Sequence, residues 1–395
     1  MEWYSKGRRA EIENLLKGVI VVDLSRLGPG PFCTMILADM GARVIKVEPP
    51  NGDPIREMIP GVYEALNRNK RSIIIDLKKE GGTAVLSRLV EKAKVFVESY
   101  RPGVAKRIGV DYEKIRSIND GIVYCSISGY GQDGPYRGWS GHDINYCAVA
   151  GISSISGDPF GPPAIGTGVP IADYCSALYA CLSILSMLYA HKGGYLDVSM
   201  TDCALSFMTT RINEYIARGR PPKEKFIGRG GYGIFKTSDE KYLAIGVVEE
   251  YFWQRLCRVL DREDLVKDSR FNSFLKRNNL MEEINSILSK AFLVRPRDEW
   301  ISLLSQADVP CSPVNFIEDL PDDPHIKHRG LIVESETNEQ QIFNILFPTR
   351  FNGELLPLRS LAPSYPGQDT DQILCETGLN ETEIELLKQG NVIKP

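Results

Sequence analysis

The sequence predicts an α/β fold, with a larger domain built on a parallel β-sheet and a smaller α+β domain. In the first half of the chain, short β-branched runs alternate with longer amphipathic segments, a pattern typical of a parallel sheet covered by helices. The 395 residues exceed the roughly 250 to 300 residues at which a single hydrophobic core stops growing. The hydrophobic fraction of 43% and the charged fraction of 25% are ordinary for a globular protein. Two domains are therefore expected, and disorder, collagen and coiled coil are disfavoured.

The larger domain begins with a predicted βαβ unit, in which residues 19–24 and 42–48 form strands around a helix at 32–40. The alternation continues along the chain, so the predicted topology is Rossmann-like. A Gly/Pro-rich stretch at 151–170 precedes a long apolar helix at 174–189. The remaining elements predicted for this domain are strands at 72–76, 95–98, 122–127 and 195–198, and helices at 81–93, at 112–118 and from 201.

The smaller domain is expected to begin near Pro221. An antiparallel strand pair is predicted between 235 and 248, turning at Asp239 and Glu240, because the apolar pattern stops at these turn residues. Helices are predicted near 252–260, 282–291 and 297–307. The predicted organisation is thus 1–220 for the first part of the larger domain, 221–330 for the smaller domain, and 331–395 for a segment that returns to the larger domain.

Charge and hydropathy exclude several classes of partner. The net charge is only -4, and no basic stripe is dense enough to follow a phosphate backbone, which argues against nucleic acid. The first basic residues are not followed by the apolar run of a secretory signal. The longest apolar stretch, 172–190, is interrupted by Asp173 and three serines, so no membrane span is expected. A cytoplasmic protein without a membrane partner is predicted.

The cysteines and histidines do not form metal-binding patterns. The nine cysteines are scattered, and none is spaced as C-x-x-C, which indicates reduced and mostly buried thiols. The four histidines include no pair at ligand spacing. We therefore expect no metal site.

The loop Leu27-Gly28-Pro29-Gly30-Pro31 joins the first predicted strand to the first predicted helix. Free backbone N–H groups and the helix dipole favour an anion or a developing oxyanion at such a junction. Two prolines remove amide donors, so the loop is not the G-x-G-x-x-G dinucleotide motif. A tight βα turn without a ligand explains the loop equally well.

Basic residues gather at strand ends and in the loops that follow them, where open α/β sheets bind ligands. They favour a phosphorylated ligand. The alternative for each is a solvated surface position, which is ordinary for Lys and Arg. The residues are Lys46, Arg68, Lys70, Arg71, Lys78, Arg101, Lys106 and Arg107.

Three further residues have side chains suited to proton transfer. His142 follows Gly141 in a predicted loop, and a loop histidine beside aromatic and acidic residues suits general acid-base chemistry. It could equally be a hydrogen-bonded structural histidine. Asp173 opens the long apolar helix, where it could be an N-cap, and Glu249 precedes another predicted helix, where a carboxylate is also ordinary.

The order of these motifs resembles the formyl-CoA transferase (class III CoA-transferase) family from residue 18 to about residue 330. The resemblance implies two subunits interlocked as a homodimer, with coenzyme A bound against the larger domain. The matching segments are 27–31, 68–72, 76–78, 98–104, 129–135, 141–146, Asp173 and 323–325. By position, the residues implied to bind coenzyme A are Lys46, Ile75, Asp76, Leu77, Lys78, Ser99, Tyr100, Arg101, Arg107, Gly141, His142, Asp143, Ile144, Asn145 and Tyr146.

Within that family the sequence looks most like the alpha-methylacyl-CoA racemases. Both transferases and racemases place an aspartate at the position of Asp173, but the segment Gly-His-Asp-Ile-Asn-Tyr at 141–146 has the racemase form. The resemblance implies that His142, assisted by Glu249, is one catalytic base and that Asp173 is the other. The glycine-rich loop of formyl-CoA transferase has only a shorter counterpart, at 228–233.

The predicted function is therefore that of a 2-methylacyl-CoA racemase, acting by 1,1-proton transfer through an enolate. Its substrate is an acyl-CoA thioester, and coenzyme A is part of that substrate. No metal or prosthetic group is required. Two alternatives stay open: a class III CoA-transferase with an aspartyl intermediate at Asp173, and a non-catalytic CoA-binding protein.

Overall fold

The computed structural model describes residues 14–166, 168–336 and 341–394, which form two compact units. Among the described residues, the larger unit comprises those within 14–153, 165–209 and 327–394, and the smaller unit those within 154–164 and 210–326. The smaller unit's main segment begins after residue 209 and ends at residue 326, whereas the sequence predicted a smaller domain from 221 to 330. The described residues of the C-terminal segment belong to the larger unit.

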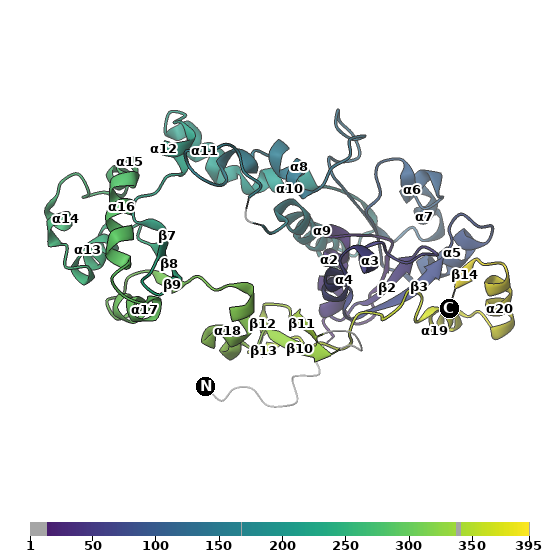
Figure 1. Ribbon diagram of the computed structural model, residues 1–395. Helices are drawn as coiled ribbons and strands as arrows, with labels where there is room; N and C mark the ends of the chain where they lie inside the picture. The colour runs from purple at the N-terminus through teal and green to yellow at the C-terminus, as the bar shows by residue number, and fades with distance from the viewer. Residues whose placement is uncertain (1–13, 167, 337–340, 395) are drawn as a thin grey trace. The chain divides into compact units, whose positions relative to one another are not determined.

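A seven-stranded sheet forms the centre of the larger unit, in the spatial order β14-β3-β2-β1-β4-β5-β6. Figure 1 shows three of its strands, β2, β3 and β14. The strands β1 to β6 run parallel, and β14 pairs antiparallel with β3. This is the doubly wound order, whose topological switch point lies between β1 and β4. It confirms the predicted α/β fold. The strands are β1 (Ile20–Asp23), β2 (Arg43–Glu48), β3 (Lys70–Ile75), β4 (Val95–Glu98), β5 (Val123–Ser128), β6 (Gly194–Ser199) and β14 (Ile393–Lys394).

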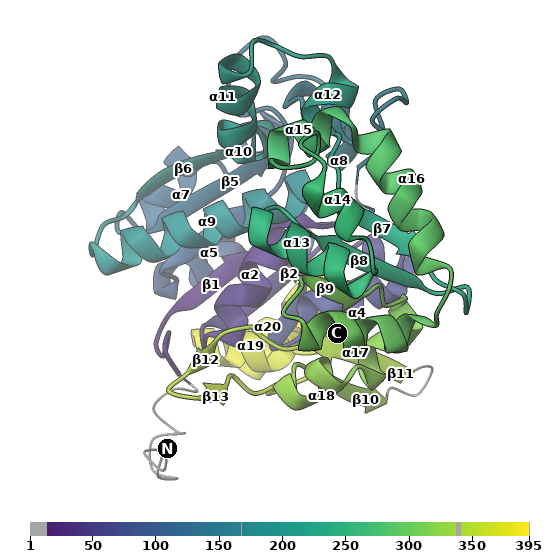
Figure 2. The ribbon, with the colours of Figure 1, turned by 90° about the vertical axis from the view of Figure 1, so that its left-hand side faces the viewer.

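Helices cover both faces of this sheet, because successive strand residues point to opposite sides. Val21 and Val97 face one core cluster, and Val22 and Phe96 face the other. Figure 2 shows α9 lying across the strands beside α2. The first face is covered by α2 (Pro29–Asp39), α8 (Asp143–Val149), α9 (Ile171–Tyr189) and α10 (Met200–Phe207), the second by α5 (Gly82–Lys92), α7 (Tyr112–Ile118), α19 (Thr370–Thr377) and α20 (Glu381–Gln389).

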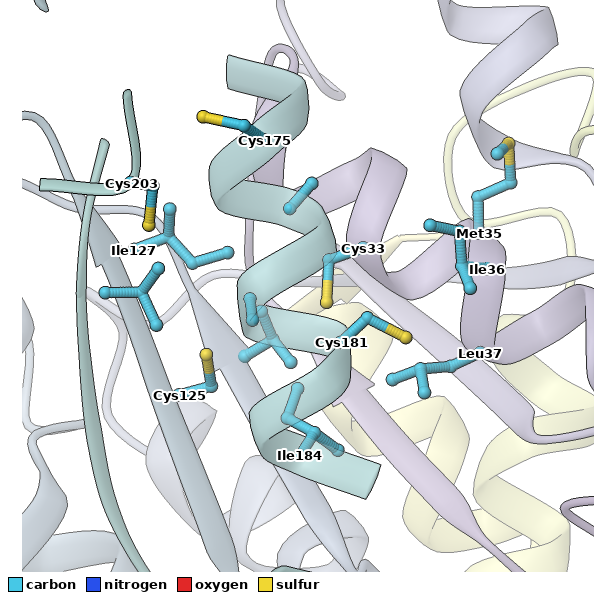
Figure 3. Close-up of a cluster of buried hydrophobic side chains, with 14 of the residues drawn as sticks. Cys33, Met35, Ile36, Leu37, Cys125, Ile127, Cys175, Cys181, Ile184 and Cys203 are labelled. Carbon is cyan, nitrogen blue, oxygen red and sulfur yellow. The ribbon is translucent and has the colours of Figure 1, made fainter. Parts of the chain in front are cut away.

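Cysteines fill much of the core between α2, α9 and the sheet. Cys33 of α2 and Cys181 of α9 lie close together, with Cys125 of β5 nearby (Figure 3). All nine cysteines are free, and seven are buried, which confirms the predicted buried thiols. By length and composition α9 would be apolar enough to cross a membrane. However, seven of its residues are buried, most of them in this core, and core helices of globular proteins pass the same test.

The larger unit also contains short elements that the sequence did not predict. The helix α8 is among them, because its seven residues are too few to show a helical period. The α2 helix begins at Pro29 rather than Phe32, since proline is well tolerated in a first turn. The other short elements are α3 (Ile55–Met58), α4 (Pro60–Asn67), α6 (Val104–Arg107), β10 (Ile332–Glu336), β11 (Gln341–Ile345), β12 (Arg350–Phe351) and β13 (Glu354–Leu355).

The smaller unit is α+β, as predicted. Its sheet has the order β7-β8-β9 with antiparallel pairing, and the turn between β7 and β8 includes Asp239 and Glu240. Trp253 and Phe292 are buried at its core. The strands are β7 (Tyr232–Lys236), β8 (Tyr242–Gly246) and β9 (Cys311–Pro313), and the helices are α11 (Thr209–Ala217), α12 (Lys223–Ile227), α13 (Glu250–Val259), α14 (Glu263–Lys267), α15 (Phe274–Asn279), α16 (Met281–Phe292), α17 (Arg297–Gln306) and, at the second boundary, α18 (Pro324–Arg329).

Candidate active site

A groove lies in the larger unit at the carboxyl ends of β1, β2, β3 and β4, beside the topological switch point. Its volume is about 670 Å³. Open α/β sheets bind ligands at this position. Six residues implied to bind coenzyme A line the groove: Ile75, Asp76, Leu77, Lys78, Tyr100 and Arg107.

A smaller pocket of about 230 Å³ shares Arg26 and Tyr100 with the groove, so the two cavities are neighbours. The guanidinium of Arg26 lies 5.4 Å from the centre of the Tyr100 ring. Arg26 was not singled out from the sequence, and only its place in the loop that follows β1 could have suggested it. The predicted site residues that line the pocket are Ser99, Tyr100, Arg101, Gly141, His142, Tyr146 and Asp173.

Asp173 is the third residue of α9 and does not cap that helix, whose N-cap position is occupied by Pro170. The interpretation of Asp173 as an N-cap is therefore wrong. Asp173 lines the pocket, and burial, with a further contribution from the negative charge of Asp143, raises its pKa to about 7. A carboxyl with a pKa near neutrality can both accept and return a proton.

The loop 27–31 brings the N-terminus of α2 against Asp173. A Cβ atom on Gly28 would lie only 2.9 Å from Oδ2 of Asp173, so any other residue here would displace that carboxylate. Leu27 has a φ of 65°, a left-handed conformation that is uncommon outside glycine and that clusters at functional sites. Leu27 and Pro29 both line the pocket. The oxyanion role of this loop stays a prediction.

His142 is the N-cap residue of α8 and is exposed. Its backbone N–H donates to Oδ1 of Asn145 at 3.0 Å, which fixes the start of the helix. The ring of Tyr146 packs between two glycines, since a Cβ on Gly129 or Gly141 would lie 2.5 or 2.7 Å from its Cε1 atom. Its hydroxyl donates to the carbonyl of Gly141 at 2.6 Å. The segment 141–146 is thus folded tightly along one wall of the pocket.

Four residues implied to bind coenzyme A line neither cavity: Lys46, Asp143, Ile144 and Asn145. Lys46 is buried, with Nζ 2.8 Å from Oδ2 of Asp53 and 3.0 Å from the carbonyl oxygen of Ser25, to which it donates. The structure thus gives Lys46 a buried ion pair instead of a place on the ligand-binding surface.

Two other basic residues of the predicted cluster are also buried. Nζ of Lys70 lies 3.2 Å from Oδ2 of Asp23 and also donates to the carbonyl of Pro31 in the first turn of α2. Arg68 pairs with Asp39, the last residue of α2, at 2.7 Å. Neither predicted alternative, phosphate contact or solvated surface, describes them. Lys70 therefore contacts the first turn of α2, and Arg68 contacts its last residue.

Glu249 lies in the smaller unit, as the exposed N-cap residue of α13. Its pairing with His142 stays a prediction. The counterpart of the glycine-rich loop, 228–233, also lies in this unit and lines a separate cavity of about 560 Å³.

Within the ranges that the structure describes, no group of three or more His, Cys, Asp or Glu side chains could hold a metal ion. The pocket itself offers acid, base and charged side chains, among them Asp173, His142 and Arg26. That no prosthetic group takes part stays a prediction.

The model of CoA-transferase family III matches residues 16–370. The chain belongs to this family. It is 33% identical to the acetyl-CoA:oxalate CoA-transferase of Acetobacter aceti over 80% of this chain and 85% of that one. It is 32% identical to the human succinyl-CoA:glutarate CoA-transferase over 91% and 85% of the two chains. It is 30% identical to the human alpha-methylacyl-CoA racemase over 96% and 97%.

A solved CAIB/BAIF family protein from Brucella suis has the same fold. It superposes with a TM-score of 0.81 at 30% identity, covering 92% of this chain and 99% of that one. The protein is thus an enzyme of the class III CoA-transferase family, a family that includes both transferases and a racemase.

Proposed function

We propose that this enzyme is a racemase that interconverts (R)- and (S)-2-methylacyl-CoA. The observation that carries the proposal is that His142 and Asp173, two groups able to exchange protons, line one small pocket that adjoins a larger groove. Racemisation needs one group to remove the proton next to the thioester carbonyl and another to deliver a proton to the opposite face.

In this mechanism one group is a base while the other is an acid, and their roles exchange with the direction of the reaction. Removing the proton at C2 leaves an enolate, whose oxygen carries the developing negative charge. The N-terminus of α2, beside Asp173, is suited to stabilise that charge. The pKa of about 7 for Asp173 supports this assignment, because a proton carrier works best near the operating pH.

We place the coenzyme A portion of the substrate in the groove. Lys78 and Arg107 are exposed at its lining and can attract phosphate groups. Arg26, shared by groove and pocket, would lie near the junction between the coenzyme and the acyl group. This arrangement directs the thioester toward His142 and Asp173.

CoA transfer is the second candidate, and the names of the related transferases favour it. In this reaction a carboxylate oxygen of Asp173 attacks the donor thioester carbon, forming an acyl anhydride and releasing CoA thiolate. The thiolate then attacks the aspartyl carbonyl, giving an enzyme thioester and the free donor acid. The acceptor carboxylate attacks this thioester, and the returning thiolate takes the acceptor acyl group and frees Asp173.

One experiment separates these candidates. We would incubate the enzyme with (S)-2-methylbutanoyl-CoA in deuterium oxide without an acceptor acid, and follow deuterium at C2 by mass spectrometry. Incorporation, together with loss of optical purity, supports the racemase. If C2 stays protiated while added carboxylic acids take up coenzyme A, the racemase proposal is wrong and the transferase is supported. Binding of coenzyme A without either turnover would indicate the third alternative, a non-catalytic CoA-binding protein.

We further propose that the enzyme is a homodimer. One side of α9 exposes Leu178, Leu182 (60% exposed) and Tyr189 (89% exposed), next to exposed Leu205 and Phe207 on α10. An apolar face of this kind favours a protein partner. Sedimentation should give twice the monomer mass of 44.1 kDa. A monomeric mass would contradict the proposed homodimer. Flotation of the protein with phosphatidylcholine vesicles would contradict the predicted absence of a membrane partner. Cell fractionation tests the predicted cytoplasmic location.

A further inference from the structure

The side chain of Asp143 connects the two helices that carry His142 and Asp173. It belongs to the first turn of α8, directly after His142. Its Oδ1 atom accepts hydrogen bonds from the backbone N–H groups of Ala172 at 2.6 Å and Asp173 at 3.3 Å, in the first turn of α9. We propose that Asp143 is a positioning residue that fixes the spacing between His142 and Asp173. This inference rests on the proposed catalytic role of those two residues.

The backbone N–H groups at the N-terminus of α9 are capped by a residue outside the helix. Its N-cap, Pro170, has no side-chain acceptor, so the first amides of α9 need a partner from elsewhere. Asp143 supplies that partner from a position 29 residues away in the chain. Because it follows His142 directly, the same side chain that caps α9 also fixes the start of α8 relative to Asp173.

The second oxygen of Asp143 is held as well. Sγ of Cys147, one turn later in α8, lies 3.7 Å from Oδ2. Asp143 lines neither cavity, so it acts through its neighbours and does not contact the substrate directly. Its carboxylate is thus fixed from both helices.

The charge of Asp143 has a second effect, on the proton affinity of Asp173. Burial is the larger cause of the raised pKa of Asp173, and the carboxylate of Asp143 adds to it. Burial, and after it the charge of Asp173, raises the pKa of Tyr146 and of Tyr174 of α9. The other charged or titratable groups that line the pocket are Arg26, Tyr100, Arg101, Tyr130, Arg137 and His142.

Two substitutions separate the geometric effect from the electrostatic one. The variant Asp143→Asn keeps an oxygen acceptor at the same place and removes the negative charge. The variant Asp143→Ala removes both. A matched control is Asn380→Ala, which removes an N-cap that accepts from the N–H of Glu383 at 3.0 Å, in α20 and away from both cavities.

The experiment measures kcat, KM, the pH profile and the thermal midpoint of the full-length enzyme, using whichever turnover the wild type shows. For Asp143→Ala we expect kcat to fall by about a hundredfold with little change in KM, as for a small misplacement of catalytic groups. Asn380→Ala should keep its kcat despite a similar loss of thermal midpoint. For Asp143→Asn we expect kcat to stay within about tenfold and the acidic limb of the profile to move to lower pH.

Wild-type kcat in Asp143→Ala, or an equal loss of kcat in Asn380→Ala, would overturn the positioning role. An unmoved acidic limb in Asp143→Asn would overturn the electrostatic part. Failure of the catalytic role of Asp173 gives a different result, since Asp173→Ala would then keep full turnover. If the wild type transfers CoA instead of exchanging deuterium, the same variants test Asp143 in that reaction, because Asp173 is the reacting group in both.

Discussion

The groove and the pocket of the larger unit are neighbours, but they are built in different ways. The groove is lined by residues that follow parallel strands, such as Asp76 and Lys78 after β3. The pocket is lined at the N-termini of helices, with Gly28 before α2 placed against Asp173 in α9 and His142 before α8. Strand ends meet at one edge of a sheet by topology alone, whereas helix ends meet only through specific tertiary contacts.

This difference indicates how each cavity should respond to change. The charged residues Lys78 and Arg107 at the groove are exposed, so the loss of either one should weaken binding gradually. Pocket residues depend on one another for position, and therefore a single loss should reduce turnover sharply. Substitutions in each cavity test this difference.

Replacing Asp173 by Asn should have the largest effect. We expect kcat to fall by about 10²- to 10⁴-fold, since the side chain can no longer exchange a proton or act as a nucleophile. The KM for acyl-CoA should change little, because the groove stays intact. Steady-state kinetics measures both values, with Asp120→Asn at an exposed site as the control. Retained kcat would show that the pocket does not perform the chemistry.

The free energy of unfolding should depend more on buried Lys70 than on exposed Lys78. Replacing Lys70 by Met leaves the buried Asp23 without its ion-pair partner, and we expect the free energy of unfolding to fall by about 3 kcal/mol. The matched change Lys78→Met, at the groove, should alter that free energy by less than about 0.5 kcal/mol. Urea denaturation measures both. Equal losses would contradict the assignment of Lys70 to the support of α2.

The pH dependence should report the state of Asp173. Because burial raises its pKa to about 7, the carboxylate is mostly protonated below that pH and mostly ionised above it. Deuterium exchange from the enantiomer whose proton Asp173 removes should rise about tenfold between pH 6 and pH 8. The exchange rate measured by mass spectrometry across this range tests the prediction. A rate that is flat from pH 5 upward would indicate an ordinary, solvated carboxylate.

The smallest effect is expected in the groove. Replacing Arg107 by Ala should raise the KM for acyl-CoA by about fivefold, because an exposed charge contributes modestly to phosphate binding. The kcat should stay near the wild-type value. Added salt should reduce the difference between the variant and the wild type, since it screens exposed charges. A large fall in kcat would instead place Arg107 among the residues that perform the chemistry.

Much of the fold was predictable, because hydrophobic period and turn residues identify its central elements. The strand β4 and the helix α7 lie at the predicted residues, and most other elements differ by a few residues at their ends. The helix α8 was missed, since its seven residues carry no clear period and its N-cap residue, His142, is not among the preferred capping residues. The three-residue strand β9 was missed for the same reason of length.

Without the family resemblance, the site was predictable only where sequence neighbours are also spatial neighbours. The segment around Tyr100 follows β4 and lies at the predicted ligand edge. The burial of Lys46 could not be seen, because its partner Asp53 is separated from it in sequence and lysines are usually exposed. The contact between Asp143 and α9 spans 29 residues and carries no local sequence pattern.

Deuterium exchange from each pure enantiomer of 2-methylbutanoyl-CoA is the most direct test of the proton-transfer assignment. The wild type should exchange C2 of both enantiomers without an acceptor acid. His142→Ala should lose exchange mainly from one enantiomer, and Asp173→Ala mainly from the other, since each base faces one side of the carbon. No exchange by the wild type, or equal losses with both enantiomers in both variants, would contradict the two-base account.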